Sequence, residues 1–257
     1  MKKIGVVLAG CGAQDGAEIH ESVITLLELD RAGVEVIIMA PDMDQFHVIN
    51  HLKGGTMDPA RNILVEASRI ARGKIVPVGT ISGDQLDALV FPGGTGMAKN
   101  LFDYSMTGPD CTIIKDVERL VVEILNENKP IGAICIAPVM IAKILQNMGK
   151  KGLVTGGHSQ QISLDINAMG IEVQKATAEE IVIDHENKIV SSLTSKDLNI
   201  FGESKIQGKD GIQESLLRLI FNGFEYQREE ICIDYGNNLN KECAILMAKK
   251  EIEKNKC

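Results

Sequence analysis

Short apolar runs alternate along the chain with segments that have the periodicity of a helix. The runs are rich in β-branched and aliphatic residues and carry little charge, which is typical of strands buried on both faces of a sheet. Two of them lead directly into glycines, at Gly10 and Gly93. The strands predicted from these runs are residues 4–9, 34–40, 74–78, 88–92, 131–134 and 153–155, with a hairpin formed by 181–184 and 188–191.

The segment between the first two strands has the pattern of an amphipathic helix that packs against a core. Asp15 and Glu18 have the spacing of an N-cap residue and its N3 partner, so the helix is predicted to begin at Asp15. Strand, short loop, helix and strand form a βαβ unit. We therefore predict an α/β fold with a doubly wound, mostly parallel sheet and helices on both faces. The apolar face of this first helix consists of Ile19, Val23, Leu26 and Leu27.

Further helices are predicted at 60–71, 113–124, 137–148 and 210–221. The connection at 41–59 interrupts the alternation of strands and helices, and connections of this length often have a function. Residues 223–257 follow as an appendage whose last part, 241–255, is a Lys/Glu-rich amphipathic helix. The chain is therefore predicted to form one domain at 1–222 and a C-terminal extension at 223–257.

Composition favours a globular protein with small-molecule chemistry. The 257 residues are 44% hydrophobic and 24% charged, enough for one large domain with its own core. A net charge of −8 provides no basic surface to neutralise phosphates, so neither nucleic acid nor an anionic membrane is expected as a partner. Trp is absent, and aromatic residues make up only 4%, so there is no stacking platform for bases.

The six cysteines are scattered, without a C-x-x-C pair or the spacing of metal ligands. This pattern favours a reduced chain inside the cell, and we expect a cytoplasmic location. Lys2-Lys3 followed by Leu8-Ala9-Gly10-Cys11 imitates a bacterial lipoprotein signal. The apolar run between them is shorter than a secretory signal usually needs, so a loop is the preferred interpretation.

Cys135 is the leading candidate for a nucleophile. It stands where the uncharged strand 131–134 gives way to helical spacing, and Pro138 fits the first turn of that helix. The unpaired N–H groups of the first helical turn then lie next to the sulfur, and they favour the thiolate that attacks carbonyl groups. The alternative is that Cys135 is a small buried hydrophobic residue, as many lone cysteines are.

In a doubly wound sheet, ligands bind beyond the carboxyl ends of the strands, where the strand order reverses. The predicted strand ends bring a thiol, carboxylates, a histidine and free amides to this edge, which are the parts needed for covalent carbonyl chemistry. The candidate residues are Glu18 and Glu21 after loop 10–15, the Gly93-Gly94 pair, Cys135, and His158 after Gly157.

Each of these side chains also has an ordinary interpretation. Glu18 is equally well explained as a helix cap. Glu21 lies one turn further and is preferred as the carboxylate that faces the sulfur, with a solvated helix charge as the alternative. His158 is either a partner in catalysis or a hydrogen-bonded loop histidine.

Other candidates are weaker. His47 and His51 share a face if their segment is helical, as a zinc pair requires. Because no third ligand has suitable spacing, substrate-pocket or surface histidines are the preferred interpretation. Cys11 and Cys111 lack the strand-to-helix setting of a nucleophile.

Several short motifs, in order, resemble the ElbB branch of the ThiJ/PfpI superfamily, whose members have the class I glutamine amidotransferase-like fold. The resemblance covers roughly residues 2–222. The matching motifs include Gly10-Cys11-Gly12, Glu18-Ile19-His20-Glu21, Val48-Ile49-Asn50-His51, Phe91-Pro92-Gly93-Gly94, Ala98-Lys99-Asn100-Leu101 and Cys135-Ile136-Ala137-Pro138.

The resemblance implies a flavodoxin-like sheet, a homodimer, and Cys135 as the elbow nucleophile with a glutamate from the first helix, for which Glu21 is favoured. Family members have been assigned a cofactor-independent glyoxalase activity and linked to isoprenoid biosynthesis. His158 looks like the histidine that some branches carry and others replace. PfpI-type peptidases place a histidine directly after the cysteine, whereas Ile136 stands there in this chain.

The leading hypothesis is therefore an enzyme that acts on small 2-oxoaldehydes such as methylglyoxal. Cys135 adds to the aldehyde, the backbone amides of Gly94 and Ile136 hold the oxyanion, and Glu21, assisted by His158, moves a proton between the two carbons. This mechanism requires no metal or other cofactor. A second hypothesis, from another class, is a redox or carbonyl-stress sensor that uses the same cysteine without turnover.

Overall fold

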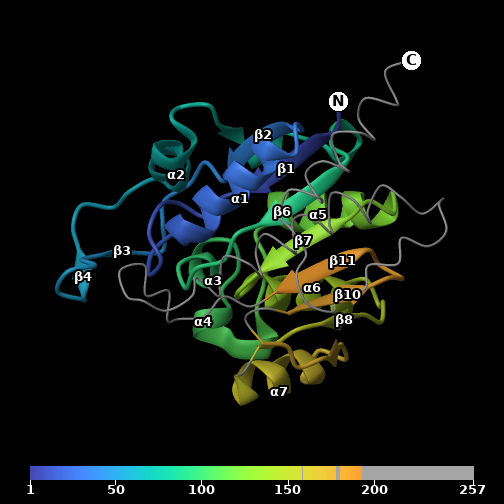
Figure 1. Cartoon of the computed structure of the whole chain (residues 1–257). Helices are drawn as coiled ribbons and strands as arrows, with labels where there is room; N and C mark the ends of the chain where they lie inside the picture. The colour runs from blue at the N-terminus through green and yellow to red at the C-terminus, as the bar shows by residue number, and fades with distance from the viewer. Residues whose placement is uncertain (158, 178–179, 193–257) are drawn as a thin grey trace, which may run out of the picture. The chain divides into compact units, whose positions relative to one another are not determined.

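The computed structural model describes residues 1–157, 159–177 and 180–192. Within these residues, seven strands form one sheet in the order β10-β11-β7-β6-β1-β2-β5 (Figure 1). Every neighbouring pair is parallel except β10 with β11. The predicted mostly parallel, flavodoxin-like α/β sheet is thus confirmed. Its strands are β1 (Lys3–Val7), β2 (Glu35–Ala40), β5 (Val76–Pro77), β6 (Ala88–Phe91), β7 (Ile131–Ile134), β10 (Ile181–Asp184) and β11 (Ile189–Ser192).

The strand order reverses between β1 and β6. From β1 the chain first builds β2 and β5 on one side, and it then returns to build β6, β7 and β11 on the other side. The loops that follow β1 and β6 therefore leave the sheet side by side, at the place where doubly wound folds bind ligands. These are the two loops that carry the predicted glycines.

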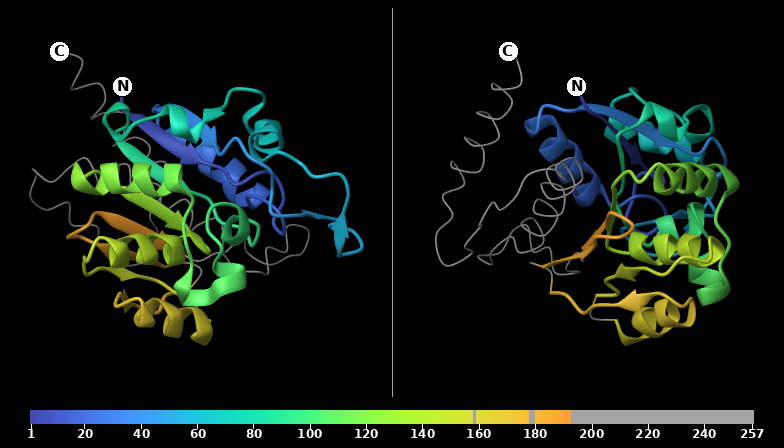
Figure 2. Two further views of the ribbon diagram at one scale, coloured as in Figure 1. Left: turned by 180° about the vertical axis from the view of Figure 1, so that it is seen from behind. Right: turned by 90° about the vertical axis from the view of Figure 1, so that its right-hand side faces the viewer.

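Helices cover both faces of the sheet. Figure 2 shows α1 on one face and α5 and α6 on the other. The predicted helices at 60–71, 113–124 and 137–148 are present within three residues at each end, whereas α3, α4 and α7 were not predicted. The helices are α1 (Ile19–Arg31), α2 (Ile63–Ala71), α3 (Met97–Asn100), α4 (Tyr104–Thr107), α5 (Lys115–Asn126), α6 (Ala137–Asn147) and α7 (Gln160–Ala168).

The core lies between the sheet and these helices. All four residues of β6 and all four of β7 are buried, as expected of central strands that are covered on both faces. On α5, the buried residues are Val117, Leu120, Val121, Ile124 and Leu125. The apolar stripe predicted for this helix therefore does pack on the core.

The first helix differs from its prediction at both its start and its buried face. It begins at Ile19, with Glu18 as the N-cap, so the predicted start at Asp15 is wrong. The carboxylate of Asp15 instead accepts a hydrogen bond from the distant N–H of Ile49 (2.7 Å), which sequence spacing does not reveal. The predicted apolar face is also largely outside, because the exposed residues of α1 include Ile19, Val23 and Leu27, each more than 40% exposed.

The long connection at 41–59 contains a small antiparallel hairpin, β3 (Val48–Ile49) with β4 (Thr56–Met57). Three short 3₁₀ turns occur at Val78–Thr80, Gly83–Gln85 and Gly108–Asp110. The predicted strand at 153–155 is β8 (Leu153–Val154), which pairs with β9 (Glu172–Val173) in a separate two-stranded sheet and so does not join the main one. The hairpin of β10 and β11 is confirmed.

Some predictions fall on residues outside the described ones. These are the helices at 210–221 and 241–255 and the division into a domain at 1–222 and an extension at 223–257, which all stay predictions. Among the described helices, none combines the length and the apolar composition that a membrane span needs.

Candidate active site

Cys135 occupies a sharp turn between β7 and α6, as the sequence predicts. Its φ of +61° lies in the left-handed region, which costs a non-glycine residue about 1 kcal/mol. Its N–H donates to the carbonyl oxygen of Ser192 on β11 (2.9 Å), which ties the turn to the sheet. Pro138 stands in the first turn of α6. A strained but well-supported residue of this kind is typical of a functional site.

Glu21 is the carboxylate that lies beside this cysteine. Its side chain is buried, at 2% exposure, and Oε2 accepts the N–H of Gly93 (2.7 Å). A Cβ added at Gly93 would lie 2.9 Å from Glu21 Oε2 and 2.6 Å from Cys135 Cβ. The carboxylate and the cysteine therefore lie next to the same backbone position. The distance between Glu21 Oε2 and Cys135 Cβ cannot exceed the sum of the two distances. A glycine is needed there because any side chain would collide with both.

Glu18 is placed as a helix cap. Its Oε2 accepts the N–H of Glu21 (2.8 Å), and its Oε1 lies 2.9 Å from Nδ1 of His20. The side-chain hydroxyl of Ser22 donates to the Glu18 carbonyl oxygen (2.7 Å). Of the two open assignments, Glu21 and not Glu18 is the glutamate brought next to the cysteine. His20 was not singled out by the sequence, because an exposed histidine on a helix carries no distinctive pattern.

The backbone amides near the sulfur are not equivalent. The N–H of Gly93 donates to Glu21 Oε2, so Gly93 holds this carboxylate beside Cys135. The N–H groups of Gly94 and Ile136 donate to no acceptor in the part of the chain that the structure describes. These two amides therefore stay candidates for oxyanion donors.

The other two described cysteines have less reactive settings. Burial raises the pKa of the Cys111 thiol to about 11, and its side chain is only 1% exposed. Burial and the carboxylate of Glu66 also raise the pKa of Cys11. Because the thiolate is the nucleophilic form, both are poor nucleophiles at neutral pH, in line with the sequence analysis.

Loop 10–17, which connects β1 to α1, is fixed by buried amide side chains. Asn100 on α3 donates through Nδ2 to the carbonyl oxygens of Ala9 (2.8 Å) and Asp15 (2.9 Å). Gln45 donates to the same Asp15 oxygen (2.8 Å). A Cβ at Gly96 would come within 1.8 Å of the Gly16 nitrogen, so the loops after β1 and β6 meet backbone to backbone.

His47 and His51 do not form a metal pair. Their segment is not helical, and the two rings have different partners. Nε2 of His47 lies 3.0 Å from Nζ of Lys99, whereas Nε2 of His51 accepts the N–H of Gln14 (3.3 Å). The described residues contain no group of three side chains placed to hold a metal ion. Lys99 was noted in the sequence only as part of a motif, because its partners come from distant loops.

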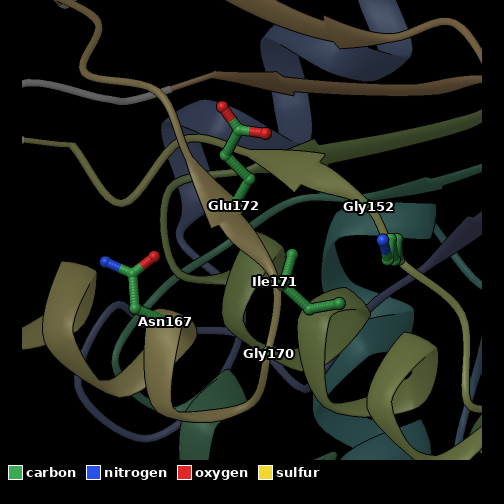
Figure 3. A pocket seen from close by; sticks show the side chains of 6 residues that line it. Gly152, Asn167, Gly170, Ile171 and Glu172 are labelled. Atoms are coloured by element: carbon green, nitrogen blue, oxygen red, sulfur yellow. The ribbon is translucent and has the colours of Figure 1, made fainter.

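A hollow of about 430 Å³ lies elsewhere in the molecule. Figure 3 shows that the polar ends of Asn167 and Glu172 lie on different sides of it and do not converge. Gly152, which lines the hollow, is next to Asp184. Asp184 pairs with Ile189, and Ile189 pairs with the first residue of β7. The hollow is therefore toward the edge of the sheet opposite Cys135 and carries no catalytic grouping. It is lined by Lys151, Gly152, Asn167, Gly170, Ile171 and Glu172.

His158 lies outside the described residues, so its predicted position near the cysteine stays a prediction. The residue before it, Gly157, is described, and its N–H donates to Oγ1 of Thr155 (3.1 Å). Thr155 in turn donates its N–H to the hydroxyl of Ser191 on β11 (3.0 Å). The chain that leads to His158 is thus attached to the strand next to β7.

Comparisons with known proteins agree with this fold and these motifs. The sequence profile of the DJ-1/PfpI family matches residues 6–207. The human protein named glutamine amidotransferase-like class 1 domain-containing protein 3, mitochondrial, is 42% identical over 200 residues, which cover 74% of this chain and 73% of the relative. The ES1 protein, mitochondrial, of Danio rerio is 31% identical over 211 residues, covering 74% of this chain and 76% of that protein.

Solved structures show the same architecture. A protein of Ehrlichia chaffeensis, described as an isoprenoid biosynthesis protein with an amidotransferase-like domain, aligns with a TM-score of 0.74 and 34% identity. The alignment covers 85% of this chain and 98% of that one. DJ-1beta of Drosophila melanogaster aligns with a TM-score of 0.51 over 98% of this chain and 97% of that one, at 18% identity. That second likeness concerns the fold alone.

Proposed function

Since the chain belongs to the DJ-1/PfpI family, as its motifs predicted, we propose that it is a cofactor-independent glyoxalase that converts small 2-oxoaldehydes into hydroxy acids. The family includes proteases, glyoxalases and stress-response proteins, so membership alone does not select a reaction. The observation that carries the proposal is the buried carboxylate of Glu21 beside the strained, partly exposed Cys135.

The first step is addition of the Cys135 thiolate to the aldehyde carbon of the substrate. A carbon–sulfur bond forms, and the electron pair of the carbonyl bond moves onto oxygen. The N–H groups of Gly94 and Ile136 donate to this oxyanion, and the N-terminus of α6 adds the positive end of its dipole. Protonation of the oxygen gives a neutral hemithioacetal.

The second step moves a proton between the two carbons. Glu21 takes the proton from the former aldehyde carbon, and the neighbouring ketone carbon receives one, so the first carbon is oxidised and the second is reduced. The product is a thioester of Cys135, which water hydrolyses to the hydroxy acid and the free thiol. Overall, methylglyoxal and water give lactic acid, and no external oxidant or reductant is needed. His158 is the predicted assistant in this transfer.

The experiment that tests the proposal measures D-lactate and L-lactate released from methylglyoxal in the absence of glutathione. We expect turnover by the wild type and its loss in Cys135→Ala. Cys111→Ala serves as the matched control, since that thiol is buried and burial raises its pKa. Turnover that persists unchanged in Cys135→Ala would remove the mechanism.

A second candidate function is a redox or carbonyl-stress sensor. Cys135 is partly exposed, whereas burial raises the pKa of the Cys11 and Cys111 thiols, so peroxide is expected to oxidise Cys135 first among the described cysteines. Mass spectrometry after mild peroxide treatment measures this preference. Selective sulfinic acid at Cys135, together with no turnover of aldehydes or amides, would favour the sensor over the enzyme.

Assembly and location complete the proposal. The partly exposed apolar residues Ile19, Val23 and Leu27 on α1 support a homodimer, which light scattering after size-exclusion chromatography tests. The scattered cysteines of the sequence favour a reducing compartment such as the cytoplasm, whereas two relatives are named as mitochondrial. A fluorescent fusion distinguishes the two compartments. A link to isoprenoid biosynthesis is supported by the description of the Ehrlichia chaffeensis protein.

A further inference from the structure

A positioned ammonium group stands near the proposed active site without a part in the mechanism above. Lys99 on α3 donates through Nζ to the carbonyl oxygen of Gln14 (3.1 Å) and lies 3.0 Å from Nε2 of His47. Burial and the Lys99 charge lower the pKa of His47, so this ring is neutral and accepts the hydrogen bond. Both partners of the ammonium group are therefore uncharged.

The charge of Lys99 is not compensated by a nearby acid. Across the described ranges, no carboxylate lies within ion-pair distance of its Nζ. The carboxylate of Asp15 belongs to the same cluster of loops, but its Oδ2 accepts the N–H of Ile49 and its Oδ1 lies 3.6 Å from His51 Nε2. A partly buried cation with only neutral partners favours an anion supplied from outside the chain.

The position of Lys99 relates it to the nucleophile. Gln14, His47 and Lys99 follow β1, β2 and β6, so they lie at the carboxyl edge of the sheet, the edge that also presents Cys135 after β7. Lys99 follows β6 and Cys135 follows β7, and these two strands are neighbours in the sheet.

Backbone contacts connect the segment that carries Lys99 to the loop that precedes α1, the helix of Glu21. Gly96, just before α3, packs on Gly16, just before α1, and Asn100 binds the same loop. The helix that carries Lys99 is thereby attached to the loop that starts the helix of Glu21. The segments that carry Lys99 and Glu21 are therefore in direct backbone contact with each other.

We propose that Lys99 binds an oxyanion group of the substrate, so that the preferred substrate of Cys135 is a 2-oxoaldehyde with a carboxylate or phosphate tail. This inference rests on the proposed function and adds its substrate class. The aldehyde end lies at Cys135 and Glu21, and the negatively charged tail lies at Lys99. Methylglyoxal lacks a tail and is accordingly a poor substrate.

The first test compares charged substrates with neutral ones. 4,5-Dioxopentanoate is paired with its methyl ester, and 3-phosphonooxy-2-oxopropanal is paired with methylglyoxal, so the two pairs distinguish carboxylate from phosphate. A charge-assisted hydrogen bond contributes about 1.5–3 kcal/mol, so Lys99→Met is expected to lower kcat/KM for a charged substrate by about 10- to 100-fold. The neutral substrates should change less than about twofold.

The control variant is Lys53→Met, which removes an exposed lysine from the hairpin of β3 and β4. It should leave both kinds of substrate unaffected. An equal loss for charged and neutral substrates in Lys99→Met, or no loss for either, would overturn the proposal.

A second test does not require turnover and separates the two levels of inference. Levulinate has a ketone and a carboxylate but no aldehyde, and it should slow alkylation of Cys135 by iodoacetamide in the wild type but not in Lys99→Met. Methyl levulinate is the neutral control. If no aldehyde is turned over but levulinate protects through Lys99, the glyoxalase assignment fails and the oxyanion site stands. Equal protection of both proteins, or of neither, contradicts the oxyanion site whatever the turnover.

Discussion

The sequence predicts that both α1 and α5 pack an apolar face on the core, but the two helices bury opposite kinds of residue. On α5, the side facing the sheet is apolar and includes Val117, Leu120 and Ile124. On α1, most of the buried residues are polar, and three apolar residues of the predicted face are more than 40% exposed. The buried residues of α1 are Glu21, Ser22, Thr25, Glu28 and Leu29.

The two buried sides therefore have different roles in the protein. Burying a polar group is unfavourable unless it is hydrogen-bonded, and Thr25 is the one buried polar side chain of α1 without such a partner among the described residues. Glu21 accepts from Gly93, Ser22 donates to Glu18, and Glu28 pairs with Arg31 (2.8 Å). The buried side of α5 packs on the apolar core, whereas the buried side of α1 places the carboxylate of Glu21 beside Cys135. Four predictions test this division, beginning with the largest effect.

Replacement of Glu21 by Gln should abolish most of the activity without unfolding the protein. The amide oxygen still accepts the N–H of Gly93, but the base is lost, and general-base catalysis contributes roughly 10²- to 10⁴-fold. The measurement is kcat/KM for the 2-oxoaldehyde, with circular dichroism as a check of folding. Glu28→Gln removes another buried carboxylate of the same helix and should retain activity. A similar loss in both variants would mean that burial on α1, and not the position beside Cys135, matters.

Matched leucine truncations should separate the two helices by stability. Leu120 on α5 is 0% exposed, so Leu120→Ala is expected to lower the free energy of unfolding by about 2–5 kcal/mol. Leu27 on α1 is 42% exposed, and Leu27→Ala should cost less than about 1 kcal/mol. Urea denaturation measures both. An equally large loss for Leu27→Ala would indicate that its surface is covered in solution, as in a dimer.

The buried thiol of Cys111 should make stability depend on alkaline pH. Burial raises its pKa from 9.0 to about 11, so the unfolded chain loses this proton first. The stabilisation is complete below pH 9.0 and is lost as the pH rises toward 11, by at most about 2–3 kcal/mol. Unfolding free energies between pH 8 and 11 should fall less steeply in Cys111→Val. Parallel curves for the two proteins would contradict the assignment.

The smallest effect concerns Thr25, on the buried side of α1. Its hydroxyl is fully buried and has no hydrogen-bond partner among the described residues. Valine has nearly the same shape without the desolvated hydroxyl, so Thr25→Val should raise the free energy of unfolding by about 1 kcal/mol. Thermal denaturation measures the change. A destabilised variant would show that the hydroxyl has a partner that matters.

The sequence predicts those features whose cause is local. The strand 131–134, the turn at Cys135 and the helix that follows Pro138 are determined by neighbouring residues, and all three are present as predicted. The parallel sheet follows from the order of strands and helices. Glu21 could be preferred over Glu18 because counting along the helix separates a cap from the next turn.

The features that the sequence misses depend on distant partners. Asp15 has the spacing of an N-cap, but its bond to Ile49 across the fold decides its role. The face that α1 buries is set by Gly93 and Cys135, which come from other strands. Lys99 acquires its setting from Gln14 and His47, two loops that are far apart in the chain. Periodicity identifies a helix, but it does not say which face a remote backbone group will select.

The contact between Gly16 and Gly96 has a consequence for how this protein can diverge. No side chain intervenes there, so a methyl group at Gly96 would displace the backbone of Asp15 and Gly16 and move α1 relative to α3. Relatives can replace the side chains that contact the two ends of a bound molecule, and they can thereby bind molecules of different chemistry. The separation between those ends is set by main-chain atoms, and we expect it to stay constant while the side chains vary.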